Sequence, residues 1–375
     1  MLWRPSPDRV AASQITRFTG FAAAASGRSF VSYDDLYDWS IAEPAAFWSA
    51  LWDFCGVRAD SRGEVALENP AAMPGARWFP DARLNFAENL LGEPGDRPAL
   101  VFRGENGTRR RLSFADLRDR VARLAGALER AGIGPGDRVA GFLPNLPETI
   151  IAMLAATSRG AVWSSCSPDF GINGVLDRFG QIRPRLLVTA DGYFYGGKWI
   201  DSIEPVARVA EALDSVEHIV VVPYDDDQAT AAKAAARLPG GTAWAQFLGD
   251  GAPPPLTFAQ LPFDHPLYVM YSSGTTGVPK CIVHGAGGTL LQHLKEHRLH
   301  TDLGPADVLF YYTTCGWMMW NWLASGLASG ATLLLYDGSP FHPDPNALWR
   351  LAEEEGVTVF GTSAKYIAAL EKAGA

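Results

Sequence analysis

The chain has 375 residues, which is beyond the size at which a single hydrophobic core keeps growing, so we expect two or more subdomains. Hydrophobic residues make up 47% and charged residues 19% of the chain, a globular composition with ample core material. The formal net charge is −9, from 32 Lys and Arg against 41 Asp and Glu, which argues against general nucleic-acid binding but allows a local basic site for a phosphorylated ligand.

The cysteines and the first residues indicate a cytoplasmic protein. Cys55, Cys166, Cys281 and Cys315 are far apart and form no C-x-x-C pair, so we expect reduced thiols rather than a disulfide framework or a zinc knuckle. The opening stretch "MLWRPSPDRVAAS" lacks the apolar core of a signal peptide.

The chain divides into a tryptophan-rich beginning and a longer α/β part. Residues 1–95 read as an irregular N-terminal layer that covers a larger body. A helix is predicted between Ser113 and Gly132, because Leu and Val recur there at helical spacing and Ser113 with Asp116 resembles a capping box. The strands expected around it are "PALVFRG", "DRVAGFLP", "AVWSSCSP", "RLLVTAD" and "HIVVVP".

This alternation of strands and helices predicts stacked, mostly parallel sheets flanked by helices. Residues 96–260 form the first predicted α/β subdomain, in which 225–260 read as a surface excursion or linker because of "DDD", "PGG" and "PPP". Residues 261–375 form the second, with strands at "PLYVMYSS", "DVLFYYTT", "ATLLLY" and "VTVFGT".

One long segment requires a membrane check. No charged residue occurs from Val308 to Tyr336, and this length allows a transmembrane helix. However, its hydroxyl groups, Asn321 and the turn-like "SGLASGATLLLY" favour a buried strand, loop, helix and strand. We therefore expect no membrane span.

The stretch "YSSGTTGVPK" at 271–280 has the composition of a phosphate-binding loop. It leaves an apolar strand, so its backbone N–H groups and the hydroxyls of Ser272, Ser273, Thr275 and Thr276 form a nest for phosphate oxygens. Gly274 and Gly277 permit close approach of the backbone, and Lys280 supplies a positive charge. A polar surface turn is the plainer alternative.

Two other motifs match known patterns only in part. "GYFYGGK" at 192–198 counts as G-x-x-x-x-G-K, but Trp199 stands where a Walker A loop needs Ser or Thr, so we reject it. "HLKEH", with His293 and His297 on one helix face, matches an inverted zinc-protease pattern. Histidines on a solvated helix face are the commoner explanation, and we assign no metal site.

The loop and its surroundings resemble a known superfamily. "YSSGTTGVPKCIVHGAGG" looks like the signature phosphate loop of the adenylate-forming acyl-CoA synthetases. "WFPDARLNFAENLL", "GDRVAGFLPNLPETIIAMLAATSRGAVWSSCSPDFG", "TADGYFYGGK" and "CGWMMWNWLASGLASGATLLLYDGSP" resemble its acetoacetate–CoA ligases, from about residue 30 onward. The resemblance implies that acetoacetate attacks ATP with loss of pyrophosphate, and that coenzyme A then attacks the acyl-adenylate and releases AMP.

The resemblance also implies roles for individual residues. The loop from Ser272 to Gly277 would hold the ATP phosphates, with Mg²⁺ bridging them and with Lys280 and Thr275 acting in catalysis. The walls of the acyl pocket would be Trp317, Met318, Met319 and Phe360, with Gly361 and Thr362 near the adenylate. Gly196, Gly197 and Lys198 would contact coenzyme A, although Tyr195 stands where the related segment has an arginine.

The family continues past the position of residue 375, with segments for adenine, ribose and a catalytic lysine. We therefore expect little or no ligase activity from this chain alone, and possible self-association through uncovered sheet edges. A ligase for another short acid, such as acetate or propionate, and a non-catalytic nucleotide-binding remnant are the alternatives. A P-loop kinase or ATPase fits least, because the loop lacks Gly-Lys-Ser/Thr.

Overall fold

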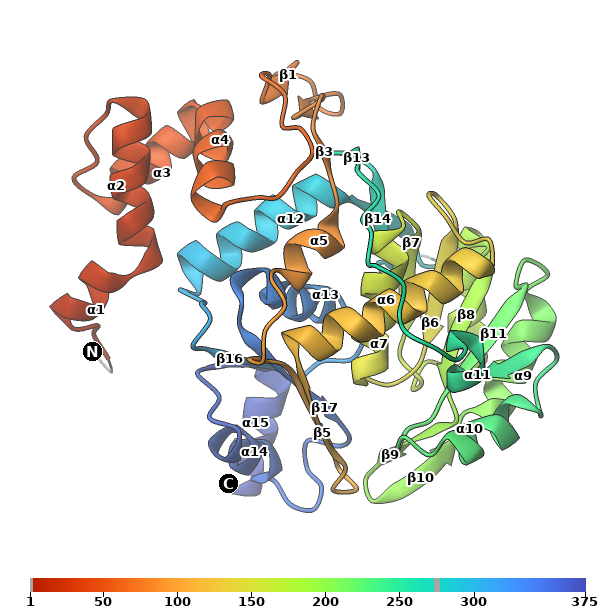
Figure 1. The fold of residues 1–375 in the computed structure, drawn as a ribbon. Helices are drawn as coiled ribbons and strands as arrows, with labels where there is room; N and C mark the ends of the chain where they lie inside the picture. The colour runs from red at the N-terminus through yellow and green to blue at the C-terminus, as the bar shows by residue number, and fades with distance from the viewer. Residues whose placement is uncertain (1–2, 273–276) are drawn as a thin grey trace.

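The computed structural model describes residues 3–272 and 277–375, and two β-sheets form its framework (Figure 1). The larger sheet has the strand order β12-β11-β8-β6-β7-β14-β15, and all neighbours run parallel except β14 and β15. Its strands are β6 (Arg138–Phe142), β7 (Val162–Cys166), β8 (Leu186–Ala190), β11 (His218–Val222), β12 (Gly241–Ala243), β14 (Pro266–Tyr271) and β15 (Cys281–Gly285).

The smaller sheet has the order β18-β16-β17-β4-β5, and only β4 and β5 pair antiparallel. Its strands are β4 (Pro98–Gly104), β5 (Arg109–Ser113), β16 (Val308–Tyr311), β17 (Thr332–Asp337) and β18 (Val359–Gly361). The prediction of stacked, mostly parallel sheets is therefore confirmed. The strands predicted from apolar runs all occur, because buried parallel strands are apolar on both faces.

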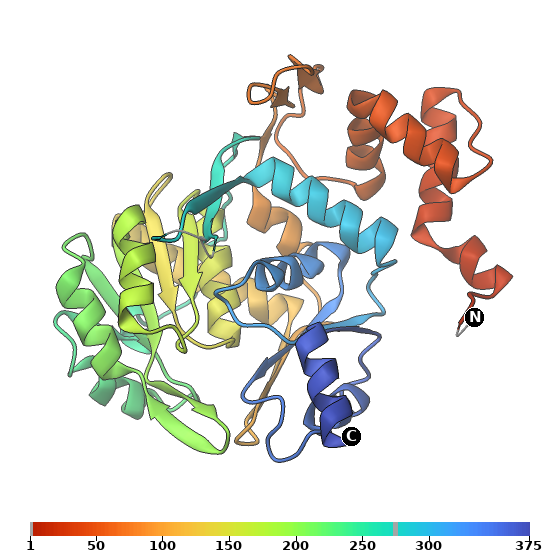
Figure 2. The same cartoon turned by 180° about the vertical axis from the view of Figure 1, so that it is seen from behind.

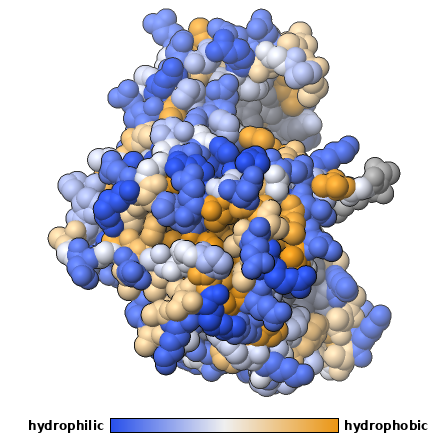
Figure 3. All heavy atoms as spheres, turned by 90° about the vertical axis from the view of Figure 1, so that its right-hand side faces the viewer, coloured by the Kyte–Doolittle hydropathy of each residue, from blue (hydrophilic) through white to orange (hydrophobic). Residues whose placement is uncertain are grey.

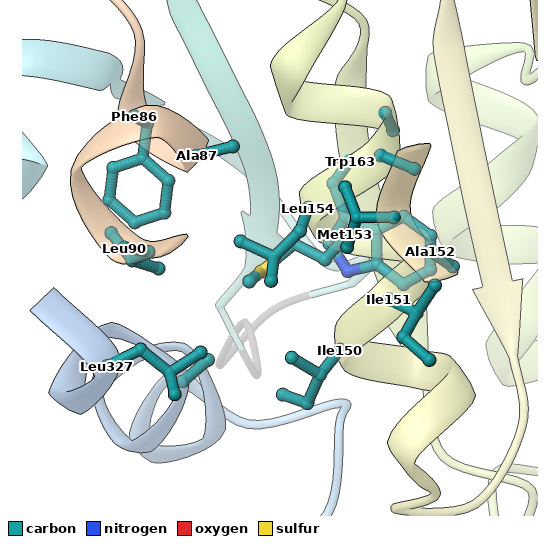
Figure 4. Packing of buried hydrophobic residues seen from close by; sticks show 14 of the residues in the cluster. Phe86, Ala87, Leu90, Ile150, Ile151, Ala152, Met153, Leu154, Trp163 and Leu327 are labelled. Atoms are coloured by element: carbon teal, nitrogen blue, oxygen red, sulfur yellow. The ribbon is translucent and has the colours of Figure 1, made fainter. Parts of the chain in front are cut away.

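Helices fill the space between the two sheets. All twelve residues of α7 (Pro147–Ser158) are buried, as its nearly continuous apolar sequence requires. Figure 4 shows Ile150 and Leu154 of α7 facing side chains of α5 (Phe86–Leu91) and of the short helix η2 (Gly326–Ser329). The other helices of this layer are α6 (Phe114–Arg130), α12 (Ala286–Leu294) and α13 (Met318–Ser325), and the predicted Ser113–Asp116 capping box caps α6.

Helices also cover the outer faces, which gives a five-layered α/β/α/β/α arrangement. The outer face of the larger sheet packs against α8 (Ile172–Ile182), α9 (Ile203–Ala212) and α10 (Gln228–Ala235). The outer face of the smaller sheet packs against α14 (Ala347–Glu354) and α15 (Ala364–Ala373). Figure 2 shows these layers from behind, and Figure 3 shows a mostly hydrophilic outer face with hydrophobic residues toward its centre.

The N-terminal part differs from the irregular layer that we expected, because it is largely helical. It contains α1 (Pro7–Ala12), α2 (Gln14–Ser26), α3 (Tyr33–Ala42) and α4 (Pro44–Cys55), whose starts are marked by Ser caps or Pro rather than by long apolar periods. Helices α2, α3 and α4 share a core with Leu299 of the π-helix η1 (Lys295–His300).

Residues 225–260 are also more regular than the predicted excursion. They contain α10, the edge strand β12 and α11 (Trp244–Leu248), followed by an extended stretch, because the alanine-rich piece forms a helix that packs on the sheet. The remaining short strands are β1 (Leu67–Glu68), β2 (Arg77–Trp78), β3 (Arg83–Leu84), β9 (Gly192–Tyr195), β10 (Lys198–Asp201) and β13 (Leu261–Pro262).

The segment from Val308 to Tyr336 forms β16, α13, η2 and β17, which is the strand, loop, helix and strand that we expected. Within the parts of the chain that the structure describes, no helix combines the length and the apolar character needed to span a membrane.

Candidate functional site

The predicted phosphate loop lies at the end of the β14–β15 hairpin. The Ser272 N–H donates to the Lys280 carbonyl over 3.0 Å and closes the base of the loop. Gly277 has a φ of 147°, a conformation that favours glycine. Ser273, Gly274, Thr275 and Thr276 lie outside the described residues. The ends of the loop therefore have the geometry of a closed turn, with Lys280 exposed to solvent.

Helix α8 supports the base of this loop. Gln181 Nε2 donates to the Pro279 carbonyl over 2.8 Å. The Arg178 guanidinium lies 4.7 Å from the ring centre of Phe170 and 5.7 Å from that of Tyr271. This places a second cation beside the last residue of β14. No motif in the sequence marks Arg178, because the contact depends on how α8 packs against the sheet.

Residues that come after the loop in the sequence line a groove of about 670 Å³. Val283, His284 and Gly285 at the end of β15 form one side, since β15 begins directly after Lys280. Helices α12 and α13 and the first turn of η1 supply the rest of the wall. The full set of lining residues is Val283, His284, Gly285, Gly288, Thr289, Gln292, His293, Glu296, Met318, Met319 and Trp322.

The predicted acyl-pocket residues occupy different places around this groove. Met318 and Met319 line it. Trp317 precedes α13, is 58% exposed, and packs edge-on against Phe170 with ring centres 6.3 Å apart. Trp317 is therefore connected to Arg178 through Phe170 rather than to the methionines.

Phe360, Gly361 and Thr362 lie on or just after β18 instead. Phe360 stacks on Trp349 at 4.6 Å between ring centres. A Cβ atom at Gly361 would lie 2.1 Å from Tyr311 Cδ2, so Gly361 lets that ring lie against the strand. Tyr311 in turn packs against Trp322, with ring centres 6.2 Å apart. One chain of contacts thus joins Gly361 to the groove.

A second cavity, of about 350 Å³, lies beside the carboxyl ends of β7, β16 and β17. Aromatic side chains dominate its wall: Tyr193, Phe194, Tyr195, Tyr312 and Tyr336. Asp337 at its edge accepts a hydrogen bond of 3.0 Å from the Tyr224 hydroxyl, and burial raises the pKa of Asp337 to about 7. A cavity at this edge of a parallel sheet is a common position for ligands in open α/β folds.

The residues predicted to contact coenzyme A form the turn between β9 and β10, next to this cavity. The backbone N–H groups of Gly196 and Gly197 donate to the Glu105 carboxylate over 3.0 and 2.7 Å. The Ser339 N–H donates to the same carboxylate over 2.8 Å. Two of the three predicted coenzyme A contacts are thus bonded to a carboxylate of the chain itself, and Lys198 is exposed.

The histidines of "HLKEH" are buried, so our expectation of a solvated helix face is wrong. His293 is 7% exposed and His297 is fully buried, because α12 and η1 pack against α13. The His297 Nε2 atom lies 2.8 Å from the Trp322 carbonyl and 3.0 Å from Ser325 Oγ. Over residues 3–272 and 277–375, no cluster of three or more His, Cys, Asp or Glu could hold a metal ion.

Comparison with known proteins agrees with this architecture. The family described as AMP-binding enzyme matches residues 86–375, and the one described as acetyl-coenzyme A synthetase N-terminus matches residues 33–90. The chain is 56% identical, over 373 residues, to the acetoacetyl-coenzyme A synthetase of Rhizobium meliloti (strain 1021), covering 100% of this chain and 56% of that protein.

Two further relatives extend the comparison. The solved structure of acetoacetyl-CoA synthetase from Streptomyces lividans matches with a TM-score of 0.91 and 45% identity, over 100% of this chain and 57% of that one. A malonamoyl-CoA synthetase of Penicillium aethiopicum is 41% identical over 395 residues, covering 99% of this chain and 54% of that protein. The chain thus spans a little over half the length of these relatives. From the match over residues 86–375, the chain belongs to the AMP-binding enzyme family.

Proposed function

We propose that this chain provides the phosphate loop and the acyl groove of an ATP-dependent acetoacetate–CoA ligase. The observation that carries the proposal is the 56% identity to an acetoacetyl-coenzyme A synthetase along the whole chain. The reaction first joins the acid carboxylate to the α-phosphorus of ATP, with loss of pyrophosphate. The thiol of coenzyme A then displaces AMP from the acyl-adenylate.

In this proposal the loop acts by neutralising negative charge on ATP. Residues 272–277 offer backbone N–H groups and hydroxyls to the phosphate oxygens, and Lys280 adds a mobile positive charge. Arg178 lies close enough to the loop base to contribute a second charge. Mg²⁺ belongs to the proposal as an ion that arrives with ATP and bridges its phosphates.

We assign the acid to the groove next to the loop. Met318 and Met319 supply flexible apolar contacts for a short carbon chain, and Trp317 acts from its place beside Phe170 at the start of α13. Phe360, Gly361 and Thr362 act from β18, where Gly361 sets the position of Tyr311.

Coenzyme A is assigned to the aromatic cavity between the sheets. Lys198 is the chain's phosphate contact in this assignment, because Glu105 holds the amides of Gly196 and Gly197. Self-association also belongs to the proposal: β18 is the edge strand of its sheet, and edge strands offer unpaired backbone groups.

One other acid is favoured by a specific observation. The 41% identical relative is named a malonamoyl-CoA synthetase, so malonamate is the second candidate substrate. Acetoacetate and malonamate have the same length, and both carry a carbonyl oxygen on C3. Acetate and propionate, which we considered from the sequence, lack that oxygen.

The test is acid-dependent release of pyrophosphate from ATP. It uses this chain and a version extended to the length of its relatives, with acetoacetate, malonamate, butyrate, propionate and acetate. We expect acetoacetate to give the highest rate. We also expect Lys280→Ala to lower kcat/KM by roughly 100-fold, as loss of one charge-stabilising donor does elsewhere. No release with any acid in either version would refute the ligase and favour a non-catalytic nucleotide-binding role.

A further inference from the structure

His293 is a buried polar side chain in the wall of the acyl groove. It lies on α12, is 7% exposed, and borders the groove together with Met318 and Met319. Its Nδ1 atom is buried and has no hydrogen-bond partner among the described residues. Buried polar side-chain atoms nearly always have a partner, so this exception requires an explanation.

Two other polar side chains that line the groove, Gln292 and Glu296, already have partners. Gln292 Nε2 lies 3.4 Å from Glu296 Oε1, and Glu296 also pairs with Lys295 at 3.0 Å. His297, one turn further along, uses its Nε2 atom on Trp322 and Ser325 and does not line the groove. The His297 Nδ1 atom is also buried without a partner, but of the two buried histidines only His293 lines the groove and can bond to a molecule there.

We propose that His293 is a specificity-determining residue that donates a hydrogen bond to the C3 oxygen of the acid. This inference rests on the proposed function. The carbon chain then packs on Met318 and Met319, while the carboxylate points toward the phosphate loop. An acid of equal length without a C3 oxygen fills the same space but leaves the imidazole unpaired in an apolar wall.

The charge state of the ring suits this task. Burial, with smaller contributions from His297 and His284, lowers the pKa of His293 to about 3, so the imidazole is neutral at physiological pH. A neutral ring carries one N–H donor. Because Nδ1 is enclosed by the protein, the donor that reaches the groove is Nε2–H, which has no hydrogen-bond partner among the described residues. A cationic side chain at this position would instead attract the acid's carboxylate, so the carboxylate would point away from the phosphate loop. A neutral donor discriminates between the two ends of a 3-oxo acid.

The experiment compares acetoacetate with butyrate, its counterpart without the C3 oxygen. The kcat/KM for pyrophosphate release is measured with both acids in the extended chain. The variants are His293→Leu, which removes the donor, and His293→Gln, which keeps an amide donor. His297→Leu is the matched control, because it removes a buried histidine of the same helical segment that does not line the groove. Thermal unfolding of each variant reports its folding.

We expect the wild type to have a higher kcat/KM with acetoacetate than with butyrate. His293→Leu should lower the ratio of these two kcat/KM values by roughly tenfold, while kcat/KM with butyrate changes little. His293→Gln should recover part of the ratio, and His297→Leu should leave it unchanged.

An equal loss of rate with both acids in His293→Leu would overturn the inference, as would an equal narrowing of the ratio in His297→Leu. If His293→Leu does not fold, the wild type still tests the inference. Equal kcat/KM values with butyrate and acetoacetate in the wild type would show that no side chain recognises the C3 oxygen, and would overturn it. A wild type without activity toward any acid refutes the proposed function instead.

Discussion

Replacement of Gly361 by alanine tests the contact through which β18 positions the ring of Tyr311. The added Cβ would lie 2.1 Å from Tyr311 Cδ2 and 2.6 Å from Tyr311 Cε2. Carbon atoms in contact are normally about 3.5–4.0 Å apart, so the ring must move by roughly 1.5 Å. The ring of Trp322 lies against Tyr311 and lines the groove, so movement in that direction is resisted by packed side chains.

Overpacking of this kind costs about 1–3 kcal/mol, and we expect Gly361→Ala to fall near the upper end because an aromatic ring must shift. In urea unfolding we expect Gly361→Ala to lower the urea concentration at the midpoint and to leave the dependence of the unfolding free energy on urea concentration unchanged. Gly180→Ala in α8 is the matched control: no atom lies within 4 Å of its added Cβ, and alanine at an exposed helical position should stabilise by about 1 kcal/mol.

A double-mutant cycle isolates the contact. In a Tyr311→Ala background the same Gly361→Ala change should cost little, since the clashing ring is gone. A midpoint for Gly361→Ala equal to that of the wild type would refute the reasoning. So would the same loss of stability with and without the Tyr311 ring.

The other predictions concern single charged groups. Glu105→Gln should destabilise the fold by about 1–3 kcal/mol and speed hydrogen exchange at the Gly196 and Gly197 amides, because the carboxylate that accepts their bonds is lost; unchanged exchange would contradict this. Burial raises the pKa of Asp337 to about 7. Between about pH 4 and pH 7 the folded chain therefore keeps a proton that the unfolded chain has lost. The free energy of unfolding falls as the pH rises through this range. Asp337→Asn cannot ionise, so its urea midpoint relative to the wild type should be higher at pH 8 than at pH 4; a pH-independent difference would count against the buried charge.

The sequence was sufficient for the elements whose residues must be buried on all sides. The central strands β6, β7, β8, β11 and β17 and helix α7 are largely apolar and buried, because they lie between two layers. The local chemistry of helix starts was equally readable, as the Ser113–Asp116 box shows. The phosphate-binding role of the stretch from Tyr271 to Lys280 stays a prediction, which rests on its dense run of Gly, Ser and Thr ending in Lys.

Other features depended on contacts between residues far apart in the chain, and only the tertiary structure decided them. The burial of His293 follows from the packing of α12 against α13, which its sequence pattern did not indicate. Arg178 reaches the loop base because α8 packs beside β14. Glu105 binds the Gly196–Gly197 turn because the β9–β10 hairpin lies against the end of β4 in the smaller sheet. The sequence determined which chemical groups are available; packing decided which of them meet, because burial and pairing depend on neighbours that no local pattern specifies.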